Sequence, residues 1–145
     1  MFKKTTILFG VLMLAGTLLA RPVAAQEFKV VVNAGADVSS ISSSDLSDIF
    51  QKKSRSLPGG ESAVPVDLPT ASPVREAFSQ AVHGRGTSAM EAWWQQQIFA
   101  GKDVPPETKD SDAAVLAFVA ATPGAIGYVS AGAALVDGVK EVPVS

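Results

Sequence analysis

The sequence contains no cysteine and only one histidine. Without cysteine the chain cannot form a disulfide, a thiolate nucleophile, a cysteine-ligated zinc site or an iron–sulfur cluster. A lipid anchor on a cysteine after a signal sequence is excluded for the same reason, so the chain is not expected to be a lipoprotein. The single histidine, His83, follows a helical segment, which favours a surface or helix-end role over a catalytic one.

Basic residues are scarce beyond the N-terminal segment. Residues 26–145 contain nine Lys and Arg against fourteen Asp and Glu, a net charge of −5. The only basic cluster in the sequence is Lys52, Lys53 and Arg55. A nucleic-acid binder needs more clustered cations than this to neutralise phosphates, so no nucleic-acid partner is expected.

Long hydrophobic runs are confined to the N-terminus. Two lysines stand within the first four residues, residues 5–20 are almost unbroken apolar sequence, and small residues precede Gln26. This order is typical of a secretory signal peptide cleaved after Ala25. A retained membrane anchor is the alternative, but a span needs about 20 apolar residues. We expect residues 1–25 to be a signal peptide and residues 26–145 to be a periplasmic domain without membrane contact after cleavage.

Strand and helix patterns alternate along residues 26–145, a length that suits one domain. Strands are predicted at 28–32, 64–68, 125–129 and 139–144, and helices at 42–53, 72–83, 88–98 and 111–121. The order β-α-β-α-α-α-β-β predicts an α/β fold, a three-layer αβα arrangement with a largely parallel sheet. The last of these helices is apolar nearly all round and should be well buried.

Local signals refine these elements. Ser72 followed by Pro73 predicts an N-cap and a first helical position. Ser88 with Glu91 matches a capping box at the start of the next helix. Pro65 cannot donate a ladder hydrogen bond, so its strand is expected at a sheet edge or to enter the sheet late.

Adjacent tryptophans, Trp93 and Trp94, could form a platform on which a sugar stacks. Their helical spacing with Met90 and Ile98 favours a different interpretation, in which this face is turned inward. At least one of the two indoles is then expected to anchor the core.

Catalytic patterns are nearly absent. Asp45 with Asp48, and Asp110 with Asp112, could be imagined as metal ligands. Both pairs lie in the first turns of predicted helices, where carboxylates already complement the helix dipole. No phosphate loop, nucleophile elbow or zincin pattern is present. We therefore expect no enzyme activity, no catalytic residue, no metal and no cofactor.

One segment has the character of a ligand site. Residues 70–75 lead from a predicted strand into a helix N-terminus, where free N–H groups favour an anion. The competing interpretation is that Ser72 only caps its own helix. Thr70, Ser72, Val74 and Arg75 are the candidate ligand-binding residues, although the sequence does not fix the direction in which Arg75 points.

Several segments resemble the phosphate ABC-transporter substrate-binding protein family. The most specific is TPGAIGYV at residues 122–129, and shorter matches lie at 30–33, 46–50, 72–78 and 99–102. The resemblance extends from about residue 28 to residue 144. It implies the type II periplasmic-binding-protein fold, here as a single PBP-like lobe.

The ligand positions implied by this resemblance differ in the present chain. The family pattern has an Arg four residues before the serine that matches Ser72, and a Gly and a Thr directly after it. This chain has Leu68, Pro73 and Val74 at those places. Leu68 cannot form a charge-assisted fork, Pro73 has no N–H and Val74 has no hydroxyl. Each lost charged hydrogen bond typically costs about 1.5–3 kcal/mol, which weakens phosphate binding.

The resemblance implies an exported phosphate- or oxyanion-binding domain associated with ABC-type uptake or sensing. The alternative is a periplasmic interaction module that keeps the fold, has lost the ligand and docks on a transporter, porin or sensor protein. Binding proteins of this class close two lobes around the solute. A single lobe needs a dimer, a partner protein or a different open site for tight capture.

Overall fold

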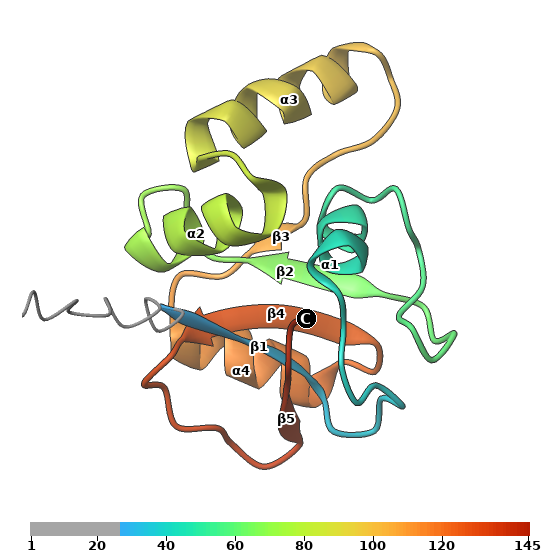
Figure 1. The fold of residues 1–145 in the computed structure, drawn as a ribbon, viewed down its shortest axis with the longest axis vertical. Helices are drawn as coiled ribbons and strands as arrows, with labels where there is room; N and C mark the ends of the chain where they lie inside the picture. The colour runs from blue at the N-terminus through green and yellow to red at the C-terminus, as the bar shows by residue number, and fades with distance from the viewer. Residues whose placement is uncertain (1–26) are drawn as a thin grey trace, which may run out of the picture.

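The computed structural model describes residues 27–145, and the expected signal peptide, residues 1–25, lies outside them (Figure 1). The elements are β1 (Phe28–Asn33), α1 (Ser43–Phe50), β2 (Val64–Asp67), α2 (Pro73–Phe78), a π-helical turn η1 (Ser79–His83), α3 (Thr87–Phe99), β3 (Glu107–Thr108), α4 (Asp112–Ala121), β4 (Ala125–Ser130) and β5 (Val139–Val142). Among these residues, no helix combines the length and the apolar character needed to cross a membrane.

The five strands form one mixed sheet in the order β3-β2-β4-β1-β5. β2 is parallel to β3 and β4, whereas β1 is antiparallel to both β4 and β5. The α/β class is confirmed, and all the strands of this sheet except β1 run in one direction, so the prediction of a largely parallel sheet fails at β1. The order of strands and helices does not set strand direction, because direction depends on the end of the sheet to which each connection returns. The two-residue strand β3 is not among the strands predicted from the sequence.

Pro65 occupies the place that its chemistry allows. It is paired with Ile126 of β4, while β3 pairs only with Val66 and Asp67. The side of β2 that faces β3 therefore has no partner strand at Pro65, and its missing N–H removes no bond there. Of the two predicted alternatives, the edge position is the one observed, because β2 already begins at Val64.

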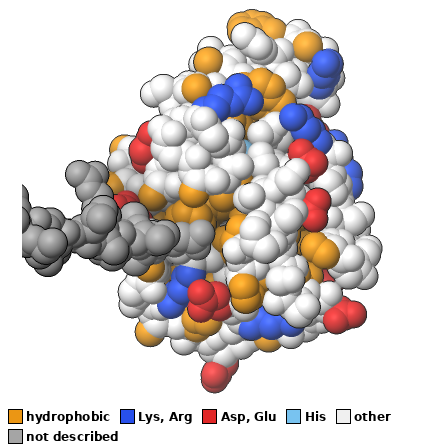
Figure 2. Space-filling view, viewed as in Figure 1, with side chains coloured by type: hydrophobic (Ala, Val, Ile, Leu, Met, Phe, Trp, Pro, Cys, Tyr) orange, Lys and Arg blue, Asp and Glu red, His pale blue; other side chains and the backbone are white. Residues whose placement is uncertain are grey.

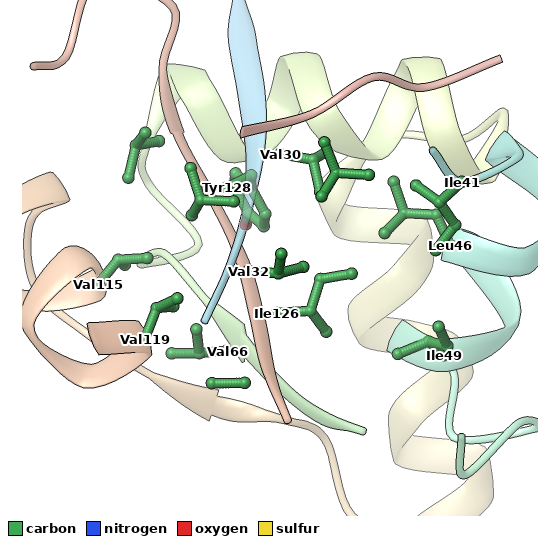
Figure 3. Close-up of a cluster of buried hydrophobic side chains, with 14 of the residues drawn as sticks. Val30, Val32, Ile41, Leu46, Ile49, Val66, Val115, Val119, Ile126 and Tyr128 are labelled. Atoms are coloured by element: carbon green, nitrogen blue, oxygen red, sulfur yellow. The ribbon is translucent and has the colours of Figure 1, made fainter. Parts of the chain in front are cut away.

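The sheet separates two helical layers. α4 packs on β4 and β1 on one face, and α1, α2 and η1 cover the other (Figure 1). In Figure 3, Val115 and Val119 of α4 lie on one side of the sheet and Leu46 of α1 lies on the other. The three-layer arrangement is confirmed. α4 buries Val115, Leu116 and Val119 against the sheet but leaves Ala113 and Ala117 exposed, so the prediction that the whole helix is well buried is wrong.

An aromatic cluster fills the layer opposite α4. Tyr128 of β4 stacks on Phe78 of α2, with ring centroids 3.9 Å apart and planes at 6°. Phe28 and Phe50 pack against the same two rings. The Tyr128 ring therefore belongs to the core, while its hydroxyl is directed to the end of β2.

The two glycines of residues 122–129 are required by close packing. Gly124 has φ 79°, and a Cβ there would lie 2.0 Å from the backbone oxygen of Ser62. A Cβ on Gly127 would approach Val66 and Val115 to 2.8 and 2.9 Å. This segment is thus dictated by packing of β4 between β2 and α4, and its resemblance to the family is evidence about fold.

α3 differs from the prediction at both ends. It begins at Thr87 with Gly86 as N-cap, so the Ser88–Glu91 capping box is wrong. The carboxylate of Glu76 binds this end instead, accepting hydrogen bonds from Thr87 N at 2.8 Å and Thr87 Oγ1 at 2.7 Å. A side chain from the preceding helix can supply the cap because α2 and α3 are brought together in space.

The far half of α3 projects beyond the sheet (Figure 1). Met90 and Trp94 are buried, which confirms that one indole anchors the core. Ile98 is 49 % exposed, so the prediction that it faces inward is wrong. Only the first half of α3 has a surface to pack against.

Candidate ligand-binding site

A cleft of about 470 Å³ lies beside the carboxyl end of β2. Three segments form it: the turn between β2 and α2, the outer half of α3, and the chain that leads into β3. Its lining residues are Pro69, Thr70, Arg75, Glu91, Trp94, Gln95, Ile98, Pro105, Pro106 and Thr108. Two of the four sequence-predicted ligand residues, Thr70 and Arg75, are brought together here.

Arg75 points back toward the end of β2. Its Nη1 donates a hydrogen bond to the carbonyl oxygen of Leu68 at 2.9 Å. Its Nε lies 3.8 Å from Oδ1 of Asp67, and both side chains are only 11 % exposed. The residue that stands at the family's arginine position, Leu68, is therefore bound by an arginine from the following helix.

Asp67 is held by Tyr128 as well as by Arg75. The Tyr128 hydroxyl donates to Asp67 Oδ1 at 2.6 Å and accepts from the backbone N–H of Leu68 at 3.2 Å. Burial raises the pKa of Asp67, and the Arg75 charge and the Tyr128 hydrogen bond oppose this effect. Burial, followed by the nearby Asp67, raises the pKa of Tyr128. The carboxylate offsets the charge of Arg75, so the site carries little net charge at this point.

The other two predicted ligand residues lie outside the cleft lining. Ser72 is the N-cap of α2 and its Oγ accepts from the Arg75 N–H at 3.3 Å. Val74 packs against the hydrophobic core. Ser72 thus has the capping role that the sequence left open as an alternative, and Pro73 stands at the first helical position as expected.

The cleft can donate hydrogen bonds to a small polar solute, but it carries little net charge with which to attract one. A guanidinium has five N–H donors, and Arg75 uses one of them on Leu68 and directs Nε toward Asp67. Thr70 and Thr108 add hydroxyls, while Glu91 places an exposed carboxylate in the lining. Asp67, Glu91 and Thr108 were missed from the sequence. An acidic residue at the end of an apolar strand was the only signal that could have indicated Asp67.

His83 ends η1 behind this cleft, as its predicted helix-end role requires. Its Nδ1 lies 2.7 Å from Ser47 Oγ, and Gln51 Nε2 also approaches it at 3.3 Å. Burial, followed by the charges of Arg85, Arg75 and Lys53, lowers the pKa of His83 to about 4. Within residues 27–145, His, Asp and Glu side chains nowhere gather in a group of three that could hold a metal ion.

Comparison with known proteins agrees with this architecture. Residues 3–142 match the family described as PBP superfamily domain. No curated protein sequence matches the chain.

Several solved structures share the fold. A phosphate ABC-transporter substrate-binding protein described from Clostridium perfringens, with phosphate bound, is 20 % identical at a TM-score of 0.63, and the match covers 81 % of this chain and 44 % of that one. An ABC-type phosphate transport receptor from Vibrio cholerae is 15 % identical at 0.63, covering 81 % and 46 %. PstS from Borrelia burgdorferi is 12 % identical at 0.57, covering 82 % and 47 %.

The chain spans less than half the length of these proteins. The matches cover most of this chain but less than half of each neighbour, which confirms the single-lobe resemblance at the level of fold. Because the family match covers nearly the whole sequence, the chain belongs to the PBP superfamily domain family.

Proposed function

We propose that this chain is an exported solute-binding domain whose ligand is a small oxyanion, with phosphate as the first candidate, in ABC-type uptake or sensing. The cleft beside β2 carries this proposal, because it places the guanidinium of Arg75 and the hydroxyls of Thr70 and Thr108 around one volume. The proteins that share its fold include phosphate receptors of ABC transporters. The partner implied by this proposal is a membrane transporter or a sensor protein.

The charge of the cleft sets the expected strength of binding. Arg75 is paired with Asp67, and Glu91 adds a second carboxylate to the lining. An anion therefore meets hydrogen-bond donors but little net positive charge. Binding should be weak for a single lobe and should tighten when a carboxylate of the lining is neutralised.

Calorimetry with phosphate and sulfate at low salt tests the proposal. Glu91→Gln should bind phosphate several times more tightly than the natural chain, because Glu91 is exposed and repels the anion. Glu27→Gln, which removes an exposed carboxylate at the start of β1, is the matched control and should change little. Absence of heat from both anions, in the natural chain and in Glu91→Gln, would overturn an oxyanion site in this cleft.

A second candidate function is docking on a protein partner, and the end of α3 favours it. Phe99 is 89 % exposed, and Val104, in the loop that follows α3, is 57 % exposed. Figure 2 shows apolar side chains at this upper end of the molecule. Contiguous exposed apolar surface commonly marks an interaction site, and Ile98, at 49 % exposed, adjoins Phe99. Periplasmic crosslinking that captures a transporter, porin or sensor, and that is lost in Phe99→Ser, would support this function.

A further inference from the structure

A second pocket, of about 470 Å³, shares Trp94 with the cleft. We call it the basic pocket and define it by its lining residues, which are Gln51, Lys52, Lys53, Arg55, Trp93, Trp94, Gln97, Lys102 and Asp103. They come from the end of α1, from α3 and from the loop after α3. Segments about fifty residues apart in the sequence thus meet around one volume.

The basic pocket concentrates the positive charge of the protein. Its four Lys and Arg are offset by one acid, Asp103, whereas residues 27–145 as a whole carry nine basic and fourteen acidic side chains. Figure 2 shows several Lys and Arg side chains at the upper right, beside α3 and above α1. The pocket is therefore positive although the domain as a whole is negative, and a local positive charge attracts anions.

The carboxylate in the basic pocket neutralises only part of this charge. Asp103 forms ion pairs with Arg55 and, at 3.8 Å, with Lys52. In the described chain, Lys53 and Lys102 have no carboxylate within ion-pair distance, and both side chains are exposed. Two ammonium groups from different segments are thus available to one ligand.

Trp93 gives the basic pocket an aromatic wall. Its ring is half-buried beside Trp94, with centroids 4.7 Å apart, and Lys53 Nζ lies 5.7 Å from its centroid. An indole beside ammonium groups suits a ligand that has both a ring with C–H groups and an anionic substituent. Inorganic phosphate would contact the charges but would leave this wall unused.

Two residues of the basic pocket, Gln51 and Lys52, have unusual local structure. Gln51 Oε1 is buried without a hydrogen-bond partner, although Nε2 of the same amide donates to Ser47 Oγ at 2.9 Å. Lys52 is the one non-glycine residue of the described chain with positive φ, 56°. Glycine is favoured at such a position after a helix, so a lysine here retains its side chain at a cost in backbone strain.

We propose that the basic pocket binds a sugar that carries a phosphate or a carboxylate. The anionic group lies between Lys53 and Lys102, and the sugar ring lies against Trp93. This site is separate from the cleft of the proposed function and uses none of its polar residues. A ligand here could be bound even if the cleft binds no oxyanion.

Calorimetry on the purified protein tests this site with four probes: glucose 6-phosphate, glucuronate, inorganic phosphate and glucose. Both acidic sugars should bind at least tenfold more tightly than inorganic phosphate or glucose. The fluorescence of Trp93 should change on binding, and Trp93→Phe should lose that change while Trp94 still reports the folded core. Glucose 6-phosphate binding without glucuronate binding would narrow the ligand to phosphorylated sugars and would overturn the carboxylate half of the proposal.

Two double variants separate the pocket from general electrostatics. Lys53→Gln with Lys102→Gln should weaken binding of the acidic sugars at least tenfold. Arg85→Gln with Lys109→Gln removes the same charge outside the pocket and should weaken it less than twofold. Equal weakening by the two pairs, or no binding of either acidic sugar, would overturn the proposal. So would inorganic phosphate binding that is as tight as that of the sugars and is lost in Lys53→Gln with Lys102→Gln.

The outcomes also distinguish this site from the cleft. Glu91→Gln acts on the cleft and should leave acidic-sugar binding within twofold of the natural chain. If the proposed function is wrong, phosphate binding is not strengthened by Glu91→Gln. If this inference is wrong, acidic-sugar binding is absent or does not depend on Lys53 and Lys102.

Discussion

The cleft and the basic pocket share Trp94 but use their charges differently. In the cleft, Arg75 is nearly buried and its charge is offset by Asp67. In the basic pocket, exposed lysines outnumber the only carboxylate. The first arrangement joins α2 to the end of β2, whereas the second leaves charge available to a ligand.

This difference shows why the fold does not fix the ligand position. An arginine that compensates a buried carboxylate cannot pair fully with a solute without leaving that carboxylate unpaired, which is costly in a low-dielectric interior. The resemblance places the oxyanion site near Ser72, yet the structure uses the groups at that junction largely for the chain itself. The charges that no internal partner requires are found some distance away, around Trp93.

The largest expected effect is on stability and comes from the paired carboxylate of the cleft. Asp67→Asn should lower the free energy of unfolding by about 3–5 kcal/mol, because it leaves Arg75 nearly buried without its countercharge. Urea denaturation measures this loss. Asp103→Asn is the matched control in the basic pocket and should leave the midpoint nearly unchanged, since its closer partner, Arg55, is 71 % exposed. Equal destabilisation by both variants would contradict the contrast between the two sites.

The pKa of His83 depends on charges from both sites. Its pKa is lowered to about 4 by burial first, then by Arg85, by Arg75 of the cleft and by Lys53 of the basic pocket. The unfolded chain, with a histidine pKa of about 6.5, takes up this proton first. Stability should therefore fall as the pH drops from about 6.5 to 4, by up to about 3 kcal/mol.

Two measurements check this prediction. His83→Gln should remove that part of the pH dependence, so the difference in unfolding free energy between the two proteins should vary with pH. Because the sequence has one histidine, its NMR titration is unambiguous, and the pKa should rise when an acidic sugar screens Lys53. A pKa near 6.5 in the free protein would show that His83 is solvated and lies outside both fields.

Much of the fold could be predicted from local patterns. The N-cap at Ser72 and the helix starts expected near residues 42 and 111 are present, because each depends on residues within one turn. The start of α3 could not be predicted, since its cap is the side chain of Glu76 from another helix. The outward position of Ile98 and the direction of β1 likewise depend on distant elements.

The ligand sites were harder to predict from the sequence, because they too depend on contacts between distant elements. Lys52, Lys53 and Arg55 were recognised as a cluster, but Lys102 joins them only through the fold. Arg75 was recognised as a candidate, but the carboxylate that offsets it lies on another element. A site made by long-range contacts has a sequence signal only where its residues happen to be adjacent.

The smallest expected effect concerns Lys52, whose backbone conformation favours glycine while ligand binding favours its ammonium group. A left-handed conformation costs a non-glycine residue roughly 1–2 kcal/mol, which glycine would not incur. Glycine loses more conformational freedom on folding, however, and this reduces the gain by up to about 1 kcal/mol. Lys52→Gly should therefore raise the free energy of unfolding by about 0.5–1 kcal/mol in urea denaturation. The same variant should weaken acidic-sugar binding severalfold, because it removes one ammonium group from the basic pocket. Lys53→Gly is the neighbouring control: its φ is not positive, so it should weaken binding while lowering stability. A gain in stability from Lys52→Gly with unchanged binding would mean that Lys52 does not contribute to the pocket.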